Sequence, residues 1–317
     1  MNESLIKYKL RDGRFVPPHH DGVSARDVMK WMTRGKRAKW PRHVPNRTFV
    51  PPPHRVSGDR LAVTWVGHAT ALIQTAGLNI LTDPFFSKRA SPSQLIGPAR
   101  VRQPGIALQD LPPIDLILLS HSHYDHLDRP TLRKLSRKHQ PVLVTPLNNK
   151  HHAPWFETTE LDWHESFAFK DVKLTALPAL HWAKRTTSDT NKSLWGAFMI
   201  ETAGGNIYFG ADTGFGAGDT FREVNRLFGA PRLALLPIGA YEPRWFMAPQ
   251  HMNPQEAVMA HQLLGAKQSL AIHHSTIQLT DEAIDAPSLA LAEALRAAQL
   301  PAQQFLVPEV GETVWIE

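Results

Sequence analysis

From about residue 59 onward the chain consists of short apolar runs separated by turn residues, whereas residues 1–58 show little periodicity. Short apolar, β-branched runs bounded by Gly, Pro, Asn or Asp are typical of strands. The first three runs follow one another at hairpin spacing, and the later ones are spaced more widely. The predicted strands are 61–67, 70–77, 78–84, 115–120, 141–146, 172–178, 194–202, 206–213, 233–239, 269–275 and 312–317.

Apolar residues at helical spacing predict helices at 129–140, 219–229, 254–265 and 287–299, and a short one near 24–35. Strands that first follow in hairpin order and later alternate with helices predict an α/β protein whose sheets carry helices on their outer faces. We expect two parts: an extended, basic and Pro-rich N-terminal arm over residues 1–58, and one folded domain over residues 59–317.

Composition narrows the function classes. The 317 residues include no Cys, which excludes disulfides, thiolate nucleophiles and thiolate metal ligands, but they include 17 His. No apolar run is long enough to span a bilayer, and the N-terminus lacks the apolar core of a secretory signal. We therefore expect a soluble, cytoplasmic protein.

The positive charge is concentrated in one stretch. Residues 26–47 contain eight Lys and Arg against one Asp, a local charge of +7, so the rest of the chain carries −1 of the total +6. Trp31 and Trp40 lie within this stretch, so it could contact anionic lipid headgroups at the inner membrane surface or nucleic-acid phosphates. The alternative is a solvated basic face.

A dense cluster of potential metal ligands follows the apolar run 115–120. In the stretch LLSHSHYDHLDRP, His121, His123, Asp125 and His126 occupy six positions. Alternate residues of an extended chain point the same way, so His121 and His123 can face one point, and a turn can bring Asp125 and His126 to a second.

Three later strand ends supply further ligands, namely His181, Asp212 and His273. A dinuclear zinc site needs about three protein ligands per ion and an anionic bridge. His121, His123 and His181 would hold one ion, Asp125, His126 and His273 the other, and Asp212 would bridge them. Manganese and iron accept similar nitrogen and oxygen ligands.

The motif SHSHYDHLD, with the downstream His, Asp and His, resembles the metallo-β-lactamase superfamily. The stretches TWVGHATALIQTAGLNILTDPFFSKRASP, PALHWAKR, NKSLWGAF, GADTGF, GAYEPRWFMAPQHMNPQEAV and AIHHSTIQLTDEAIDAP resemble the branch of N-acylphosphatidylethanolamine-hydrolysing phospholipase D and its bacterial relatives. This resemblance covers residues 40–315. It implies an αββα sandwich of two mixed sheets flanked by helices, and the same seven metal ligands.

The resemblance also assigns residues that would support the ligands. Asp83 matches a carboxylate that orients a ligand imidazole, and His68 would have a similar supporting role, or would be a hydrogen-bonded turn residue. The family has an aromatic residue after the last ligand, where this chain has His274. Strand alternation lets only one of the pair His273–His274 face inward, and we prefer His273.

For substrate binding, the resemblance points to Tyr241, Arg244, Gln250 and His251 at the border of the cleft. His251 would assist the leaving group together with Asp125 and Asp212 at the metals, or it would help cap the helix that begins near Asn253. The remaining histidines, including His19, His20, His151, His152 and His164, are expected at the surface.

The function expected from this pattern is a dinuclear-zinc hydrolase, most simply a phospholipase D-like phosphodiesterase in which a metal-bridging hydroxide attacks phosphorus. The alternatives are a metal-dependent lactonase for a sugar-phosphate lactone, a nuclease of the same fold, a redox iron protein and a non-enzymatic binding module. No nucleic-acid partner is expected, because no nucleic-acid module accompanies the basic arm. A relative that dimerises makes a homodimer an expectation.

Overall fold

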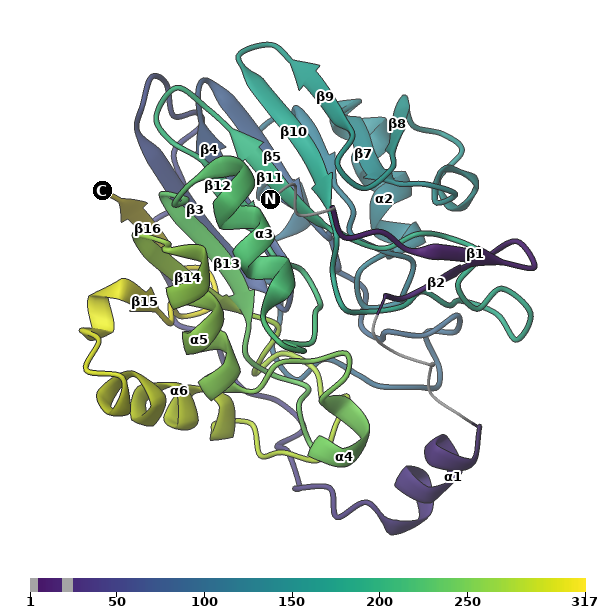
Figure 1. The fold of residues 1–317 in the computed structure, drawn as a ribbon. Coiled ribbons are helices and arrows are strands. Elements are labelled where there is room, and N and C mark those ends of the chain that lie inside the picture. The colour runs from purple at the N-terminus through teal and green to yellow at the C-terminus, as the bar shows by residue number, and fades with distance from the viewer. Residues whose placement is uncertain (1–4, 19–24) are drawn as a thin grey trace.

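Two seven-stranded sheets face each other at the centre of the computed structural model, which describes residues 5–18 and 25–317 (Figure 1). The strands of the first sheet, in spatial order, are β16 (Thr313–Ile316), β3 (Leu61–Gly67), β4 (Thr70–Thr75), β5 (Leu78–Thr82), β6 (Leu116–Leu118), β7 (Val142–Pro146) and β8 (Thr158–Leu161). Those of the second are β15 (Phe305–Leu306), β14 (Gln268–Ile272), β13 (Leu233–Pro237), β12 (Ile207–Phe209), β11 (Ala197–Glu201), β10 (Val172–Leu177) and β9 (Ser166–Phe169).

Helices cover the outer face of each sheet, which confirms the predicted αββα sandwich. Helices α3 (Asp219–Phe228), α5 (Pro254–Leu264) and α6 (Ala286–Ala297) pack on the second sheet, and α2 (Arg129–His139) packs on the first (Figure 1). Within residues 5–18 and 25–317, the remaining helices are α1 (Ala25–Arg34), α4 (Arg244–Met247) and three 3₁₀ turns at Leu108–Asp110, Lys150–His152 and Ala302–Gln304.

The apolar runs are continuous because both faces of the sheets are buried. In β6, Leu116 and Leu118 point into the core between the sheets, whereas Ile117 points outward beneath α2. In β4, Ile73 points into the core between the sheets, whereas Leu72 points outward. Each strand therefore fills two hydrophobic layers.

Caps fix the starts of the two helices that follow the predicted site loops. The Asp128 side chain accepts a hydrogen bond from the Thr131 N–H at the start of α2, two residues after His126. At the start of α5, Asn253 and Glu256 form a capping box. Asn253 therefore caps this helix, and His251 does not.

The sequence missed the shortest and most polar strands. It did not predict the edge strands β8, β9 and β15, or a hairpin of β1 (Lys9–Arg11) and β2 (Arg14–Val16) within the N-terminal arm. It also extended several strands beyond their C-terminal ends, among them β5, which ends at Thr82, β12, which ends at Phe209, and β14, which ends at Ile272. After β5 and β12 the chain turns away from its sheet at residues with positive φ: at Asp83, itself a predicted site residue, and at Ala211, directly before Asp212.

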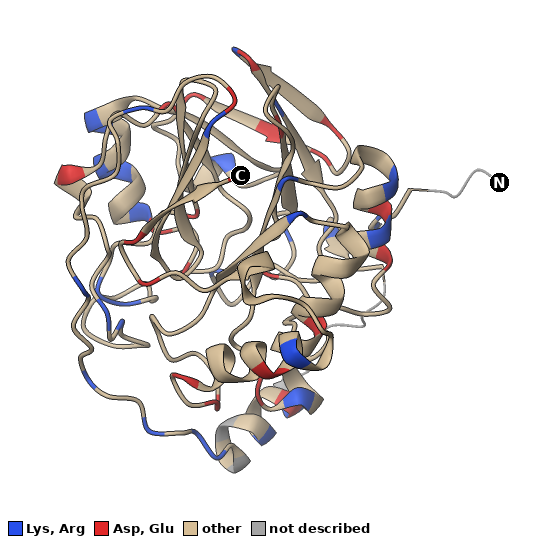
Figure 2. Ribbon diagram, turned by 90° about the vertical axis from the view of Figure 1, so that its left-hand side faces the viewer, with Lys and Arg blue, Asp and Glu red and all other residues tan. Residues whose placement is uncertain are grey.

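The N-terminal arm packs on the sandwich through its hairpin and then follows the surface after α1. Tyr8 and Phe15 of the hairpin region join a small apolar cluster with Trp163 and Trp195. After α1 the chain runs along the outside of the sandwich, and its Lys and Arg residues, coloured blue in Figure 2, are exposed. His19 and His20 lie outside the described residues.

Candidate metal centre

The predicted ligands lie together at one edge of the sandwich. Strands β3, β5 and β6 of the first sheet run in one direction, and so do β10, β12, β13 and β14 of the second. The loops that follow their C-terminal ends carry the polar residues. From the first sheet these are His68, Asp83, His121, His123, Asp125 and His126, and from the second they are His181, Asp212 and His273.

Three imidazoles form the first group. His123 Nδ1 lies 2.9 Å from His121 Nε2 and 3.2 Å from His181 Nε2. The other ring nitrogens of two of these residues are already engaged: Nδ1 of His181 lies 3.1 Å from the Gln250 carbonyl, and Nδ1 of His121 lies 2.8 Å from the Ser120 hydroxyl. Since the Ser120 hydroxyl donates to Asp83, it must accept from His121.

This hydrogen-bond pattern fixes the tautomers. Because the Gln250 carbonyl and the Ser120 hydroxyl both accept here, Nδ1 of His181 and of His121 carries the proton, and the Nε2 atoms of the two rings present lone pairs toward His123. Burial, followed by neighbouring imidazoles, holds the pKa of His121 well below its usual range, and burial lowers the pKa of His123 to about 3 and that of His181 to about 4. Neutral imidazoles that converge in this way fit a bound cation.

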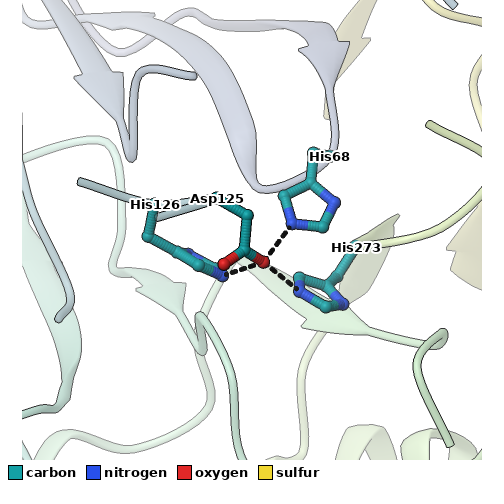
Figure 3. A group of neighbouring side chains, drawn as sticks. All are labelled: His68, Asp125, His126 and His273. Carbon is teal, nitrogen blue, oxygen red and sulfur yellow. Dashed lines mark hydrogen bonds and ion pairs between the residues drawn. The ribbon is translucent and has the colours of Figure 1, made fainter. Parts of the chain in front are cut away.

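The second group surrounds a single carboxylate oxygen. Figure 3 shows three imidazoles directed at Asp125, whose Oδ2 lies 2.8 Å from His68 Nε2, 3.3 Å from His126 Nε2 and 3.6 Å from His273 Nε2. All four side chains are buried or nearly so. The ligand atoms of this group lie within 4.8 Å of one another, so they could hold a metal ion.

His126 is oriented by Asp83. Its Nδ1 lies 2.7 Å from Asp83 Oδ2, so Nδ1 carries a proton and Nε2 faces Asp125 and Asp212. A bare Nε2 lone pair would be repelled by those carboxylates, so the position requires a proton or a metal ion. The metal-free site accordingly favours the protonated form. Burial opposes that form, but Asp212 and Asp125 raise the pKa of His126 well above its usual value.

His273 behaves similarly. Burial lowers its pKa, but the negative charge of Asp212 and the close contacts of the ring with the Asp125 and Asp212 carboxylates outweigh burial and raise the pKa to about 9. The two carboxylates shift in the opposite sense. Burial would raise the pKa of Asp125 and Asp212, but His126 and neighbouring imidazoles hold both values well below the usual range.

Asp212 lies between the two groups. Its Oδ2 is 3.1 Å from His126 Nε2 and 3.7 Å from His181 Nε2, and its Oδ1 is 3.1 Å from His273 Nε2. Buried Oδ1 has no hydrogen-bond partner, and neither has Nε2 of His126 or His273. Orphaned atoms of this kind fit metal ligands, because a buried polar group without a partner is otherwise costly.

The side chains of His273 and His274 point in different directions, although both residues follow the end of β14 at Ile272 and His273 has a φ of 61° in place of an extended conformation. His273 faces the carboxylates, whereas the His274 ring stacks on Trp65 with centroids 4.5 Å apart and its Nδ1 lies 3.0 Å from the Ser275 hydroxyl. His68 is a turn residue between β3 and β4, with φ of 56°, and it also contacts Asp125. Burial lowers the pKa of His68 to about 3, so a neutral ring donates to the carboxylate through Nε2–H.

Two supporting residues were missed by the sequence analysis. Ser120 connects Asp83 to His121, since its N–H and hydroxyl both donate to the Asp83 carboxylate, at 2.7 and 2.6 Å. Arg185 donates from one guanidinium nitrogen to the carbonyls of Ser122 and Leu127, at 2.8 and 2.7 Å. It also lies 4.1 Å from the ring centre of Tyr124, whose hydroxyl donates to the Arg185 carbonyl. Arg185 therefore ties together the two ends of the loop that carries His123, Asp125 and His126.

The residues proposed for substrate binding separate into two sets. Gln250 and His251 line a cavity of about 750 Å³ over the ligand cluster, whereas Tyr241 and Arg244 are not among its lining residues. The Arg244 guanidinium is held by Glu256, at 2.7 and 2.9 Å, and by the His251 carbonyl. Substrate binding by Tyr241, Arg244, Gln250 and His251 stays a prediction.

The other histidines lie away from the cluster. His151 is exposed, and its ring centre lies 3.7 Å from that of the partly buried His152, with the planes tilted by 46°. His164 Nε2 donates a hydrogen bond to the Ile6 carbonyl, 2.9 Å away. Among the described residues, every other grouping suited to a metal ion shares members with the cluster above; these include Asp83 with His121 and His126, and His181 with Asp212 and His251.

Comparisons with known proteins agree with this architecture. Residues 78–274 match the model of the β-lactamase superfamily domain. The chain is 37% identical over 280 residues to N-acyl-phosphatidylethanolamine-hydrolyzing phospholipase D 1 of Caenorhabditis elegans, covering 83% of this chain and 77% of that protein. It is also 37% identical over 228 residues to the mitochondrial enzyme of the same description from Saccharomyces cerevisiae, covering 69% of this chain and 48% of that one.

Among solved structures, the metallo hydrolase Igni18 of the archaeon Ignicoccus hospitalis superposes with a TM-score of 0.61 at 20% sequence identity, covering 81% of this chain and 99% of that one. This likeness shows the shared fold. Together with the sequence matches, it shows that the chain belongs to the metal-dependent hydrolases of the β-lactamase superfamily, in the branch related to the N-acyl-phosphatidylethanolamine-hydrolysing phospholipases D.

Proposed function

We propose that the protein is a dinuclear-zinc phosphodiesterase that cleaves a phospholipid, most simply an N-acylphosphatidylethanolamine. The observation that carries the proposal is the position of Asp212 between two groups of ligand atoms, at the floor of a cavity large enough for a lipid headgroup. The two phospholipase D relatives support the substrate class.

In this proposal His121, His123 and His181 hold one ion, Asp125, His126 and His273 hold the second, and Asp212 contacts both. Bound zinc ions would supply a water of lowered pKa and positive charge for the phosphoryl oxygens. The residues of the chain orient the ligands: Asp83 holds His126, Ser120 holds His121, and the Gln250 carbonyl holds His181. A protein nucleophile is not required.

His251 is the side chain best placed to move a proton during the reaction. It lines the cavity, its ring lies 5.1 Å from that of His181, and its buried Nδ1 has no partner. Burial holds its pKa well below the usual value, so the ring is neutral at physiological pH. It could therefore accept the proton released by the attacking water and pass it to the leaving oxygen.

The surface beside the cavity suits a peripheral approach to a membrane, which we include in the proposal. The described part of the chain contains no helix long and apolar enough to cross a bilayer. Met29 of α1 and Trp245 of α4 are exposed at 68% and 49%, and Lys30 lies 4.3 Å above the Trp245 ring. Exposed apolar residues among basic ones bind anionic lipid surfaces. Dimer formation remains a prediction.

The test combines a metal count with two assays on the same sample. Elemental analysis of protein purified without added metal should give close to two zinc ions per chain. The protein should hydrolyse both bis(p-nitrophenyl) phosphate and a long-chain N-acylphosphatidylethanolamine in mixed micelles. Asp212→Ala should abolish both activities, whereas Asp219→Ala, which changes an exposed carboxylate of α3, should leave them intact.

Other outcomes would redirect the assignment. Cleavage of the simple phosphodiester without any cleavage of the lipid would remove the proposed substrate. Two zinc ions with neither substrate cleaved would favour the lactonase alternative. A protein that takes up no metal would remove the mechanism altogether.

A further inference from the structure

One wall of the cavity over the metal centre is apolar, and part of that wall comes from the N-terminal arm. Val28 and Trp31 of α1 line it together with Phe246 and Met247 of α4 and with Leu279. The arm lies outside the matched superfamily domain of residues 78–274. A segment remote in sequence from the metal ligands thus contributes directly to the space above them.

Trp31 is fixed in this wall by contacts on several sides. Its ring stacks on Phe246 with centroids 5.3 Å apart and planes 20° from parallel. The indole N–H donates to Asp281 Oδ1 at 3.0 Å, and the guanidinium of Arg37 lies 4.6 Å from the ring centre. An indole held in this way is an ordered surface for a ligand.

A single segment, residues 278–282, holds the arm against the cavity. The Ala38 N–H donates to the Asp281 carbonyl at 2.8 Å, and the Ala38 carbonyl accepts from Gln278 Nε2 at 2.6 Å. Trp40 Nε1 donates to the Glu282 carbonyl at 2.8 Å. The position of α1 is therefore set by hydrogen bonds to the folded domain.

The same segment also positions the chain that leads to α4. The buried Glu282 carboxylate accepts from the N–H groups of Ala240 and Glu242, at 2.6 and 3.1 Å. Leu279 and Thr280, from the middle of this segment, line the cavity. The two helical parts of the apolar wall are thus held in one arrangement by one loop.

The cavity lining combines two kinds of chemistry. The five apolar side chains named above carry no charge, and Pro17, Trp182 and Ala240 add further apolar lining. The polar lining comes from Lys184, Thr190 and Asn191 and from metal-ligand candidates such as Asp212. A ligand that fits this combination has an anionic group at the metal-ligand candidates and a hydrocarbon chain along the apolar wall. Burying such a chain favours binding by up to about fourfold per methylene.

We propose that Val28 and Trp31 of the N-terminal arm, together with Phe246, Met247 and Leu279, form the subsite for a hydrocarbon chain of the substrate, so that the arm sets the preference for chain length. This inference rests on the proposed function, because it takes the substrate to be a lipid phosphodiester. It adds the residues that distinguish a long chain from a short one.

The test measures binding rather than turnover. A series of n-alkyl phosphates, from butyl to decyl, is titrated calorimetrically into the metal-containing protein below the concentration at which each forms micelles. The wild-type affinity should rise with chain length, by at most about fourfold per methylene. In Trp31→Ala the affinity for butyl phosphate should be close to the wild-type value, and the loss should grow with each added methylene.

Three further variants separate the wall from its anchor. Trp31→Phe keeps an apolar ring against Phe246 and should retain most of the dependence on chain length. Thr33→Ala changes a residue of the same helix whose side chain is exposed and does not line the cavity, so it should follow the wild type. Asp281→Asn weakens the anchor of Trp31 and should reduce the dependence on length without affecting butyl phosphate.

The inference is overturned if the curves of Trp31→Ala and the wild type are parallel at every length, or if wild-type affinity does not change with length. Circular dichroism and the unchanged affinity for butyl phosphate show that each variant is folded. Hydrolysis of the N-acyl phospholipid by the wild type is measured separately. If the wild type hydrolyses the lipid but Trp31→Ala and wild type show the same dependence of affinity on chain length, the proposed function stands and the subsite is refuted. If the length dependence is lost in Trp31→Ala but the wild type does not hydrolyse the lipid, the subsite stands and the proposed function is refuted.

Discussion

Replacing Asp83 with Asn changes one atom and disturbs both groups of ligands. Asp83 is fully buried, and it accepts three hydrogen bonds: from the Ser120 N–H at 2.7 Å, from the Ser120 hydroxyl at 2.6 Å and from His126 Nδ1 at 2.7 Å. An amide offers only one acceptor oxygen in place of two. The variant is therefore isosteric but cannot satisfy all three donors.

Both orientations of the Asn amide are unfavourable. If its oxygen faces the Ser120 N–H, its NH₂ faces His126 Nδ1, and the ring proton of His126 must move to Nε2, the atom that would ligate the metal. If the oxygen faces His126, the NH₂ opposes the Ser120 N–H. Loss of a carboxylate that orients a ligand imidazole typically lowers metal affinity by about 10- to 100-fold, or roughly 1.4–2.8 kcal/mol.

The assay is competition for zinc between the apo-protein and a chromophoric chelator of known affinity. Asp115→Asn is the matched control, because Asp115 also accepts from a backbone N–H, that of Asn79, and lies at the opposite end of β6 from the cluster. We expect the control to keep wild-type zinc affinity. A folded Asp83→Asn protein with unchanged affinity for both ions would refute the orientation argument.

Three further predictions concern the same site. Arg185→Ala should weaken zinc binding by about tenfold, because the carbonyls of Ser122 and Leu127 lose their shared donor. Arg185→Lys should retain only part of the wild-type affinity. Equal zinc affinity in the wild type and both variants, measured by the same competition, would contradict the positioning role. Zinc binding to the apo-protein at pH 7.5 should release roughly two protons from the protein. The pKa of His273 is raised to about 9 and that of His126 is also raised, whereas metal ligation requires neutral rings. Calorimetry in buffers of different ionisation enthalpy measures the number of protons, and no release would show that these imidazoles are already neutral. Removal of the metal by a chelator should lower the Tm by roughly 10 °C, because a metal at a thousand times its Kd stabilises the fold by about 4 kcal/mol and each kcal/mol corresponds to roughly 2–4 °C. The Tm of the Asp212→Ala protein should change little on chelation. An equal shift of Tm in the wild type and this variant would place the stabilising metal elsewhere.

The part of the site that could be predicted from the sequence is the part encoded locally. His121, His123, Asp125 and His126 occupy one short loop, so their spacing alone indicates two convergent points. The distant members, such as His273, were expected near strand ends because fully buried strands appear as continuous apolar runs, and His273 directly follows β14, which ends at Ile272. The αββα sandwich followed from the order of those runs and from the family resemblance.

Other features depend on contacts that leave no local pattern. Arg185 acts on the backbone carbonyls of Ser122 and Leu127, and any residue type carries a carbonyl. The Gln250 carbonyl reaches His181 from nearly seventy positions away. Edge strands β8 and β9 are only partly buried and lack an unbroken apolar run, and the arm that supplies Trp31 to the cavity has no periodicity that would distinguish it from a linker.

The origin of the ligands in both layers has a mechanical consequence. Asp125 and His126 follow β6 of the first sheet, whereas His181, Asp212 and His273 follow strands of the second. Ions held between them would act as a clip that fastens the two sheets at one end, where polar loops replace the apolar interior. Hydrogen exchange after chelation should therefore accelerate first in the amides near these strand ends, on both sheets together, while the middle of each strand stays protected.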